Sequence, residues 1–357
     1  MDFKEVLLDW YKKNGRELPW RGISTPYFIW VSEVILQQTR VNQGMEYYFR
    51  FIGKFPDIES LANAPIDELM KVWQGLGYYS RARNLQAGAR QVVSDYGGKL
   101  PETYEELLKI KSLGYYAAAA VASFAFNKVV PAVDGNVFRI LSRVFGIFTP
   151  IGSTSARKEF FSLAQELISK ENPAAFNQAI IDFGALVCTP RNARCETCPM
   201  SGFCYAFSNN IVYKLPVKQK KVPPKDRFLC YFMIRKGNYT FVRRREENDI
   251  WHSLYEFPVL ETKGQLSHEE ILVHPFFTEL FGNVDVKIHS ISDPIKHQLS
   301  HLTIWAQFVI VSVDSVPYLV KSKYRQVKID ELEKFSVPRL IDSYMAAEQT
   351  AKYFLKK

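Results

Sequence analysis

Residues 111–137 read KSLGYYAAAAVASFAFNKVVPAVDGNV, and this stretch combines the pattern of a buried helix with a few isolated polar residues. The alanines, valines and aromatics in its middle predict a helix that is apolar on every side. Gly114 precedes two tyrosines at one end, and Asp134, Gly135 and Asn136 close the stretch at the other. A carboxylate at the end of an apolar run must be hydrated, paired or used in chemistry.

The hydrophobic period changes near residue 227. Up to about Phe207, apolar residues recur every three or four positions, and short breaks with Gly, Pro or Thr separate the runs, which predicts successive helices. After the change, RFLCYFMIRKGNYTFVRRR predicts two strands around a Lys-Gly-Asn turn, and HLTIWAQFVIVSV predicts a longer third strand. The last segment returns to a helical pattern. We therefore expect a helical domain over residues 1–207 and a second domain over residues 227–357.

Residues 208–226, between these two domains, have the composition of a basic, proline-rich linker. Residues 214–227 contain six basic side chains, among them Lys220 and Lys221, with one acidic side chain and three prolines. Such a segment is typically extended and solvated. A strap that follows nucleic-acid phosphates would have the same composition, so both interpretations stay open.

The length, the net charge and the distribution of apolar residues restrict the class of protein. At 357 residues the chain is too long for one comfortable core, so two or three domains are expected. The net charge of +9 favours an anionic partner such as nucleic acid. The start MDFKE does not resemble a signal peptide, and no apolar run reaches about 18 residues. These features indicate a cytoplasmic protein that does not span a membrane.

Four of the five cysteines are clustered, at Cys188, Cys195, Cys198 and Cys204. In a chain without a secretion signal, such clustering predicts a metal site more than disulfides. The single C-x2-C pair between wider loops suits a [4Fe–4S] cluster, whereas a structural zinc site usually has two tight pairs. Zinc is the alternative. The fifth cysteine, Cys230, lies in a predicted strand and is expected to be an inert core residue.

The spacing C-x6-C-x2-C-x5-C after a helical domain resembles the endonuclease III superfamily of base-excision DNA glycosylases. Other marks of that superfamily are a helix-hairpin-helix, matched by IKSLG at 110–114, and an aspartate about twenty residues later, matched by Asp134. Within it the chain is most similar to the adenine DNA glycosylases (the MutY family). The stretches that carry this similarity are LPWR (18–21), WVSEVILQQTRV (30–41), GLGYYSRARNL (75–85), AVDGNV (132–137) and FNQAIIDFGALVCTP (176–190).

This resemblance covers essentially the whole chain and implies a multidomain fold. It implies an all-α helix-hairpin-helix glycosylase core with a [4Fe–4S] cluster, followed by an α+β Nudix-like domain. The core would comprise a six-helix module over about residues 25–131 and a cluster module formed by residues 1–24 with 132–207. The implied enzyme is a monomeric, monofunctional hydrolase, associated with the bacterial nucleoid. It would excise adenine mispaired with 8-oxoguanine or guanine from double-stranded DNA.

Two carboxyl groups in different environments suit such a reaction, which needs a protonated leaving base and a stabilised sugar cation. Glu33 lies in the apolar helix FIWVSEVIL, where burial raises a carboxyl pKa, so it is expected to be the general acid. Asp134, at a predicted helix N-terminus, is expected to stay ionised and to stabilise the cation. The structural alternatives are a buried glutamate paired with an arginine and a plain N-cap.

The hairpin helix of lyase-competent relatives carries a lysine whose amine attacks the sugar. The resemblance aligns Tyr116 with that lysine, and a phenol cannot form a Schiff base, so base removal without strand cleavage is expected. Tyr116 and Asn136 would orient or shield the sugar; a core tyrosine packed on the alanine helix is the alternative. Ser112 replaces the first hairpin glycine, so Gly114 is the candidate for a left-handed turn that exposes N–H groups to a phosphate.

The resemblance also implies two sets of DNA contacts in the helical part. The wedge around the opposing base, with an exposed Leu-Gly-Tyr loop, would consist of Gln38, Thr39, Leu76 and Tyr78. The adenine pocket would consist of Arg16, Trp20, Arg21 and Gln178. A helix C-cap with a packing tyrosine, and a staple of the N-terminal segment, are the corresponding structural alternatives.

The second domain resembles the Nudix-like module that checks for 8-oxoguanine. Residues 264–282, GQLSHEEILVHPFFTELFG, lack the acidic cluster with which Nudix hydrolases bind magnesium, so recognition without hydrolysis is expected. The lesion contacts would come from Ser300 and His301. Leu299 stands before them where the family has a phenylalanine.

Other functions remain as alternatives. A bifunctional glycosylase with lyase activity is disfavoured by Tyr116 and by the second domain. A non-catalytic iron–sulfur protein that binds DNA is disfavoured by the presence of both Glu33 and Asp134. A Nudix-type pyrophosphatase is disfavoured by the missing acidic cluster.

Overall fold

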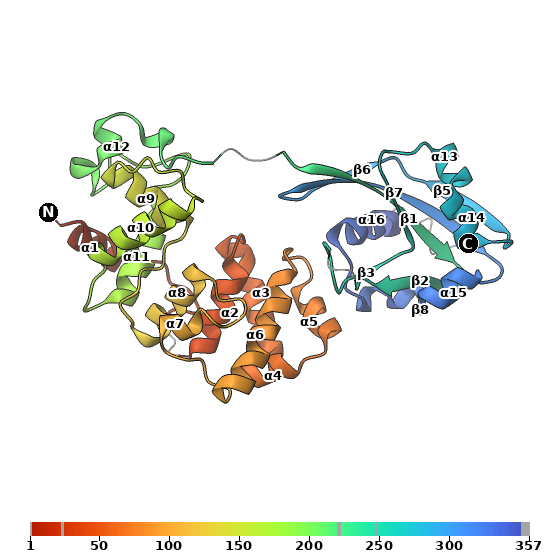
Figure 1. Cartoon of the computed structure of the whole chain (residues 1–357), viewed down its shortest axis with the longest axis horizontal. Helices are drawn as coiled ribbons and strands as arrows, with labels where there is room; N and C mark the ends of the chain where they lie inside the picture. The colour runs from red at the N-terminus through yellow and green to blue at the C-terminus, as the bar shows by residue number, and fades with distance from the viewer. Residues whose placement is uncertain (1, 23–24, 220–222, 247–248, 351–357) are drawn as a thin grey trace. The chain divides into compact units, whose positions relative to one another are not determined.

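The computed structural model describes residues 2–22, 25–219, 223–246 and 249–350 (Figure 1). The chain divides into two compact units. The first, here called the helical unit, consists of Met1–Ala64 and Arg83–Lys220; the second, the mixed unit, consists of Pro65–Ala82 and Lys221–Lys357. Lys220 and Lys221 of the predicted linker lie outside the described residues. The domain boundaries expected from the sequence stay a prediction, because the units assign Pro65–Ala82 differently.

Helices make up the regular structure described in the helical unit. They are α1 (Phe3–Asn14), α2 (Pro26–Leu36), α3 (Val41–Lys54), α4 (Ile58–Asn63), α6 (Ser80–Tyr96, which begins in the mixed unit), α7 (Tyr104–Leu107), α8 (Tyr115–Phe126), α9 (Gly135–Phe145), α10 (Thr154–Leu167), α11 (Pro173–Leu186), η1 (Ser201–Phe203), α12 (Tyr205–Ser208) and η2 (Val212–Lys214).

Helix α8 is the alanine-rich helix expected from residues 111–137, and it packs against α2 and α11. Its residues Ala117–Ser123 are all buried, which explains why small side chains fill it: they allow neighbouring backbones to approach closely. Gly88 of α6 serves the same purpose. A Cβ there would collide with the Lys111 carbonyl oxygen and lie 2.9 Å from the Trp30 ring, so α6, α2 and the hairpin turn meet only around a glycine.

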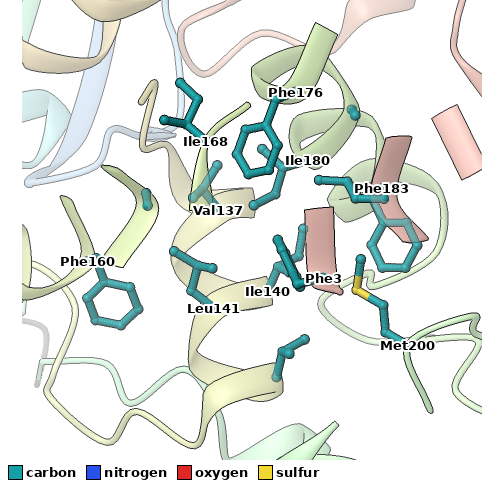
Figure 2. Close-up of a cluster of buried hydrophobic side chains, with 14 of the residues drawn as sticks. Phe3, Val137, Ile140, Leu141, Phe160, Ile168, Phe176, Ile180, Phe183 and Met200 are labelled. Atoms are coloured by element: carbon teal, nitrogen blue, oxygen red, sulfur yellow. The ribbon is translucent and has the colours of Figure 1, made fainter. Parts of the chain in front are cut away.

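A second hydrophobic core joins α1, α9, α10 and α11 (Figure 2). Phe3 from α1, Ile140 and Leu141 from α9 and Phe183 from α11 converge there, and each is at most 5% exposed. This core brings the first helix of the chain together with helices that follow residue 134. The core sets the position of α9, and therefore also the position of Asp134, the residue directly before it.

The mixed unit contains two β-sheets with helices around them. Its strands are β1 (Lys225–Arg235), β2 (Tyr239–Arg244), β3 (Tyr255–Glu256), β4 (Val259–Thr262), β5 (Val286–Ile291), β6 (Ile295–Gln298), β7 (Leu302–Val313) and β8 (Arg325–Lys328). Its helices are α5 (Ile66–Trp73), α13 (His268–Val273), α14 (Pro275–Phe281), α15 (Tyr318–Lys323), η3 (Ile329–Lys334) and α16 (Arg339–Thr350).

The larger sheet has the strand order β4-β1-β7-β5, with β6 also paired to β7, and the smaller sheet has the order β3-β2-β8. Strands β1 and β7 are parallel neighbours, as Figure 1 shows. The sequence predicted strands β1 and β2 around a short turn, and both exist. They enter different sheets, however, because β1 pairs with β7 and β4 while β2 pairs with β8 and β3.

Side chains of β1 alternate between two cores on opposite faces of the larger sheet. Leu229 and Tyr231 enter one core, and Cys230, Phe232 and Ile234 enter the other. Cys230 is 4% exposed, and burial raises the pKa of its thiol to about 12. It therefore has the environment of a core residue. None of the helices in the described part of the chain is long and apolar enough to cross a membrane.

Candidate active site

A cavity of about 640 Å³ opens in the helical unit where α2, α8, α9 and α11 converge. It brings together residues that the sequence had placed in three separate predicted groups. The predicted site residues that line it are Arg16, Trp20, Arg21, Glu33, Gln38, Thr39, Tyr116, Asp134, Asn136 and Gln178. With Arg40, which also lines it, two carboxyl groups, a phenol, three guanidinium groups and several amides share one concave site.

Glu33 reaches this cavity from the middle of α2 and is 7% exposed. Burial raises the pKa of its carboxyl group to about 7, since the charged form loses hydration; the hydrogen bond from the Tyr116 phenol lowers it by less. Within the described residues Glu33 forms no ion pair, so the alternative of a glutamate paired with an arginine is not what the structure contains. At neutral pH the carboxyl group can hold and release a proton.

Tyr116, the second residue of α8, hydrogen-bonds to Glu33, and it also packs on Ala119 and Ala120 of its own helix. The predicted core role and a role in the cavity therefore coexist. Burial and the two nearby carboxylates raise the pKa of the Tyr116 phenol well above its usual range, so it stays a hydrogen-bond donor. The Tyr116 side chain contains no amine that could attack a sugar.

Asp134 is the N-cap of α9 and at the same time lines the cavity. Its Oδ1 accepts hydrogen bonds from the backbone N–H groups of Asn136 and Val137, at 2.8 and 2.9 Å. Its Oδ2 accepts one from the Asn136 side chain at 2.6 Å. Burial raises the pKa of Asp134, and these hydrogen bonds offset part of the rise. The carboxylate is thus held in one orientation at the positive end of a helix.

Asn136 is itself held from a second side. The Arg139 guanidinium donates to its Oδ1 at 2.8 Å, and α11 approaches so closely that a Cβ at Gly184 would lie 2.6 Å from the Asn136 Cβ. A side chain at position 184 would therefore push Asn136, and with it Asp134, out of place. Packing of α9 on α11 thus supports the geometry of the carboxylate.

Asp182 is an important polar residue that the sequence reasoning missed. It is fully buried in α11, and Arg16 and Arg21 both bind its carboxylate, at 2.6 and 2.7 Å. Burial alone would raise the pKa of Asp182, but hydrogen bonds from Arg21 and Arg16 outweigh it and lower the pKa. Asp182 follows Gln178 by four residues, so helical spacing could have placed both on one face of α11.

The two arginines and Gln178 therefore do more than line the cavity. They staple the N-terminal segment to α11, as the structural alternative had it, because the Gln178 Oε1 accepts a hydrogen bond from the Tyr11 hydroxyl at 2.8 Å. Trp20 is 6% exposed and packs edge-on against Tyr48, so it presents only part of its ring to the cavity.

The hairpin differs from the prediction at its glycine. Gly114 is extended, with φ −79° and ψ 178°, and is the N-cap of α8. Ser112 instead occupies the left-handed region, with φ 83°, so the expectation that Gly114 makes the left-handed turn is wrong. The Trp30 indole N–H donates a hydrogen bond to the Ser112 Oγ at 3.0 Å, which helps to hold a conformation that a serine rarely adopts.

The predicted wedge residues lie in two different units. Gln38 and Thr39 follow α2, and Gln38 has φ 59°. In the mixed unit Tyr78 is 46% exposed, but Leu76 is only 8% exposed, so the expectation of an exposed leucine is wrong. The chain turns back at this point, where the Trp73 indole donates to the Gly77 carbonyl oxygen at 3.1 Å, and this turn directs Leu76 inward.

Ser300 and His301 lie in the turn between β6 and β7, and both are exposed. Within the same unit the Ser300 hydroxyl is 2.5 Å from the Tyr78 hydroxyl. The Gln298 side chain braces the turn, since its Nε2 donates to the carbonyl oxygens of Leu299 and Leu302 at 3.0 and 3.2 Å. Leu299 packs against the core of the mixed unit that contains Leu229 and Tyr231.

The four clustered cysteines form no disulfide and all line one small cavity. Burial raises the pKa of Cys198 to about 11, and the other three thiols add to the rise, because neighbouring thiolates repel one another. The Arg143 guanidinium donates to the Cys188 sulfur at 3.4 Å. Among the described residues, no group of three or more His, Cys, Asp or Glu side chains is arranged to hold a single metal ion.

Comparison with known proteins assigns both halves of the chain. Residues 31–167 match the HhH-GPD superfamily of base excision DNA repair proteins, and residues 230–347 match the NUDIX domain. The adenine DNA glycosylase of Buchnera aphidicola subsp. Baizongia pistaciae is 32% identical over 317 residues, which cover 88% of this chain and 87% of the relative. The chain belongs to the adenine DNA glycosylases.

The human adenine DNA glycosylase is 43% identical over 213 residues, which cover 57% of this chain and 39% of that protein. Among solved structures, a thermostable thymine-DNA glycosylase is 31% identical with a TM-score of 0.54, and the match covers 58% of this chain and 95% of that one. The predicted family, the fold class and the activity of an adenine-specific DNA N-glycosylase in base excision repair are thereby confirmed. The roles of individual residues stay predictions.

Proposed function

We propose that this adenine DNA glycosylase excises adenine opposite 8-oxoguanine by hydrolysis, without cutting the strand. The observation that carries the proposal is the cavity in which Glu33, with a pKa of about 7, faces a second carboxylate held by three hydrogen bonds, Asp134. Their environments differ, as acid and stabiliser require. The same cavity holds a phenol, Tyr116, and no amine on the hairpin helix.

Each group has a separate role in the proposed reaction. The Glu33 carboxyl group donates its proton to a ring nitrogen of the flipped adenine, so that the base leaves as a neutral molecule with the electron pair of the glycosidic bond. The sugar becomes an oxocarbenium ion, which the Asp134 carboxylate stabilises. Water then adds to the anomeric carbon, and its proton goes to the Glu33 carboxylate, which restores the acid. Tyr116 hydrogen-bonds to Glu33 and Asn136 to Asp134, so these two side chains orient the carboxyl groups and, with them, the sugar.

Arg16, Arg21, Trp20 and Gln178 form the wall that positions the adenine. Because Asp182 binds both guanidinium groups, the arginines are fixed in place before the base enters. A pre-positioned wall lowers the entropy lost when the flipped base binds. Gln38 and Thr39 at the end of α2 line the same cavity and would contact the DNA around the gap.

The experiment that tests this function is a single-turnover assay on a duplex with adenine opposite 8-oxoguanine. Each time point is split, and one half is treated with hot alkali. Breaks that appear only after alkali are expected for base removal without lyase action. Breaks in both halves would contradict the monofunctional mechanism, and no breaks in either half would contradict excision.

Recognition of 8-oxoguanine would come from the turn that carries Ser300 and His301. Two side chains hold this turn: Gln298 bonds to two of its carbonyl oxygens, and the Thr303 hydroxyl donates to the Gln298 Oε1 at 3.2 Å. The exposed Ser300 and His301 can therefore offer hydrogen-bonding groups in a defined arrangement. One chain carries both the excision cavity and this turn, which supports action as a monomer on chromosomal DNA.

Gln298→Ala should reduce the preference for adenine opposite 8-oxoguanine over adenine opposite guanine by about three- to tenfold, the effect of losing one well-placed hydrogen bond. Excision opposite guanine should change little, because the excision cavity is untouched. The measurement compares single-turnover rates on the two duplexes. Gln326→Ala on β8 is the matched control, since this glutamine is exposed on a strand of the same unit and away from the turn. An unchanged preference would show that the brace does not position the lesion contacts.

The cysteine site fits a [4Fe–4S] cluster by the chemistry of its donors. Four free thiols line one small cavity, and the raised pKa of Cys198 reflects a site in which thiolates are unstable without a positive centre. Cys188, Cys195, Cys198 and Cys204 would hold the cluster, which would tie α9 and α11 to the segment that follows them. Anaerobically purified protein should contain about four iron and four sulfide ions per chain. A single zinc ion per chain would contradict this assignment.

A further inference from the structure

A second cavity lies beside the first in the helical unit, and nothing in the proposed mechanism uses it. Its volume is about 670 Å³, within the range of sites that bind small molecules or nucleotides. It is bounded by residues of α7, α8, α9 and α10, and Gln37 and Tyr116 line both cavities. The two cavities therefore adjoin at Gln37 and Tyr116.

Five aromatic side chains line this second cavity. Tyr104 of α7 and Phe161 of α10 lie nearly parallel, with ring centroids 6.3 Å apart, and Phe138 of α9 also lines the site. At the rim Tyr115 is 58% exposed, which is unusual for so large a ring. Flat apolar surfaces of this kind suit a planar heterocycle or a sugar face.

The rim also carries two cations near the start of α10. Arg157 and Lys158 are both exposed, and neither forms an ion pair within the part of the chain that the structure describes. The Arg157 guanidinium lies over the Tyr115 ring, 4.6 Å from its centroid, which orients both groups at the mouth of the cavity. An anionic group at this mouth would meet two cations that form no ion pair in the described residues.

Aromatic walls with cations at the rim are complementary to a nucleotide, whose base or sugar is flat and whose phosphate is anionic. Neighbouring nucleotides are covalently joined, so the nucleotide next to one flipped into the first cavity must stay close to that cavity. The second cavity shares Gln37 and Tyr116 with the first, so it is within reach of such a neighbour. A protein segment would equally fill an apolar groove, but it would not require two unpaired cations beside it.

We propose that this second cavity binds a nucleotide next to the target adenosine on the same strand, with its phosphate between Arg157 and Lys158 and its base or sugar against the aromatic walls. This inference rests on the proposed function, since it needs the target nucleotide to occupy the first cavity. This contact is to the strand that loses its base, and it does not involve that base. It should therefore strengthen DNA binding both before and after excision.

The test is a scan in which each phosphate around the target is replaced, one at a time, by an uncharged methylphosphonate. The duplexes carry an adenosine analogue that resists excision, and affinity is measured for the wild-type protein and for Arg157→Ala. Wild-type affinity should fall about three- to tenfold at one linkage beside the target, and the loss at that linkage should be clearly smaller for Arg157→Ala, which keeps only Lys158 there. Arg157→Ala should also lower the slope of log K against log salt by about 0.9.

Two further variants separate charge from stacking. Arg157→Lys keeps the charge, so it should retain most of the salt slope. Tyr115→Ala removes an exposed ring at little cost to folding, and it should abolish the change in emission of a fluorescent base placed beside the target. Lys170→Ala is the control, because this exposed lysine of the same unit lines neither cavity.

The outcomes distinguish this inference from the proposed function. If wild-type protein excises adenine but no linkage is coupled to Arg157, and Arg157→Ala has the salt slope of Lys170→Ala, the second site does not bind the strand and the inference fails alone. If the wild-type protein does not excise adenine, the proposed function itself fails.

Discussion

Glu33→Gln should lower the single-turnover rate of adenine excision about 10³-fold, within the range that one general acid contributes. An amide cannot give a proton to the leaving base, yet glutamine has nearly the same shape and still accepts a hydrogen bond from Tyr116. Duplex affinity should therefore stay within about twofold of wild type. The measurement is a single-turnover time course beside a binding titration on the same duplex.

The pH dependence of the wild-type rate provides a second readout for the same residue. An acid with a pKa of about 7 is protonated below that pH, so the rate should fall as the pH rises above 7. On the acidic side the rate should fall again when Asp134 becomes protonated, since burial raises the pKa of that group too. The alkaline limb belongs to Glu33 alone, and it should be absent from the residual activity of Glu33→Gln.

Stability separates loss of chemistry from loss of structure. The folded-state pKa of Glu33 is raised above its unfolded value, so ionised Glu33 destabilises the fold as the pH rises from the unfolded pKa through the folded one. Glu33→Gln should consequently melt no lower than wild type at pH 8. Glu46→Gln, at an exposed position on α3, should change neither rate nor melting temperature. Near-wild-type excision by Glu33→Gln would rule out its role as the acid.

The local sequence pattern was sufficient to predict the environment of residues whose position depends only on their own helix. Glu33 is one of two polar residues in an apolar run, and that alone predicted its burial. Asp134 comes directly before a helical segment, and the structure makes it an N-cap. Both features depend on a few neighbouring residues, so the sequence carries them without knowledge of the fold.

Features that join distant parts of the chain were not predictable in this way. Asp182 binds Arg21 across 161 positions, and nothing near either residue reveals the other. Ser112 keeps its left-handed backbone with help from Trp30, 82 positions away. Strands β1 and β2 form a short hairpin in sequence, yet pairing with β7 and β8 draws them into separate sheets. In each case a long-range contact outweighed a sound local rule.

Asp134→Asn should lower the excision rate about 10²- to 10³-fold, the usual effect of removing a preorganised charge that stabilises a transition state. Asparagine is as good an N-cap as aspartate, so α9 keeps its first turn, and the melting temperature should fall only as far as loss of the hydrogen bond from the Asn136 side chain requires. The substitution removes the negative charge while the Oδ1 position still accepts from the backbone N–H groups of Asn136 and Val137. Single-turnover rates and thermal melts of the same preparation measure both quantities.

A comparison with a second N-cap shows whether the charge or the cap is responsible. Asp57 caps α4 in the same unit, where its Oδ1 accepts from the Ser60 backbone N–H at 2.7 Å, and it lies outside the cavity. Asp57→Ala should cost about 1 kcal/mol of stability and leave excision unchanged. Asp134→Ala should lose a similar amount of stability and also lose excision as severely as Asp134→Asn does. If Asp134→Asn instead excised adenine at the wild-type rate, Asp134 would be only a cap, and another group would have to stabilise the cation.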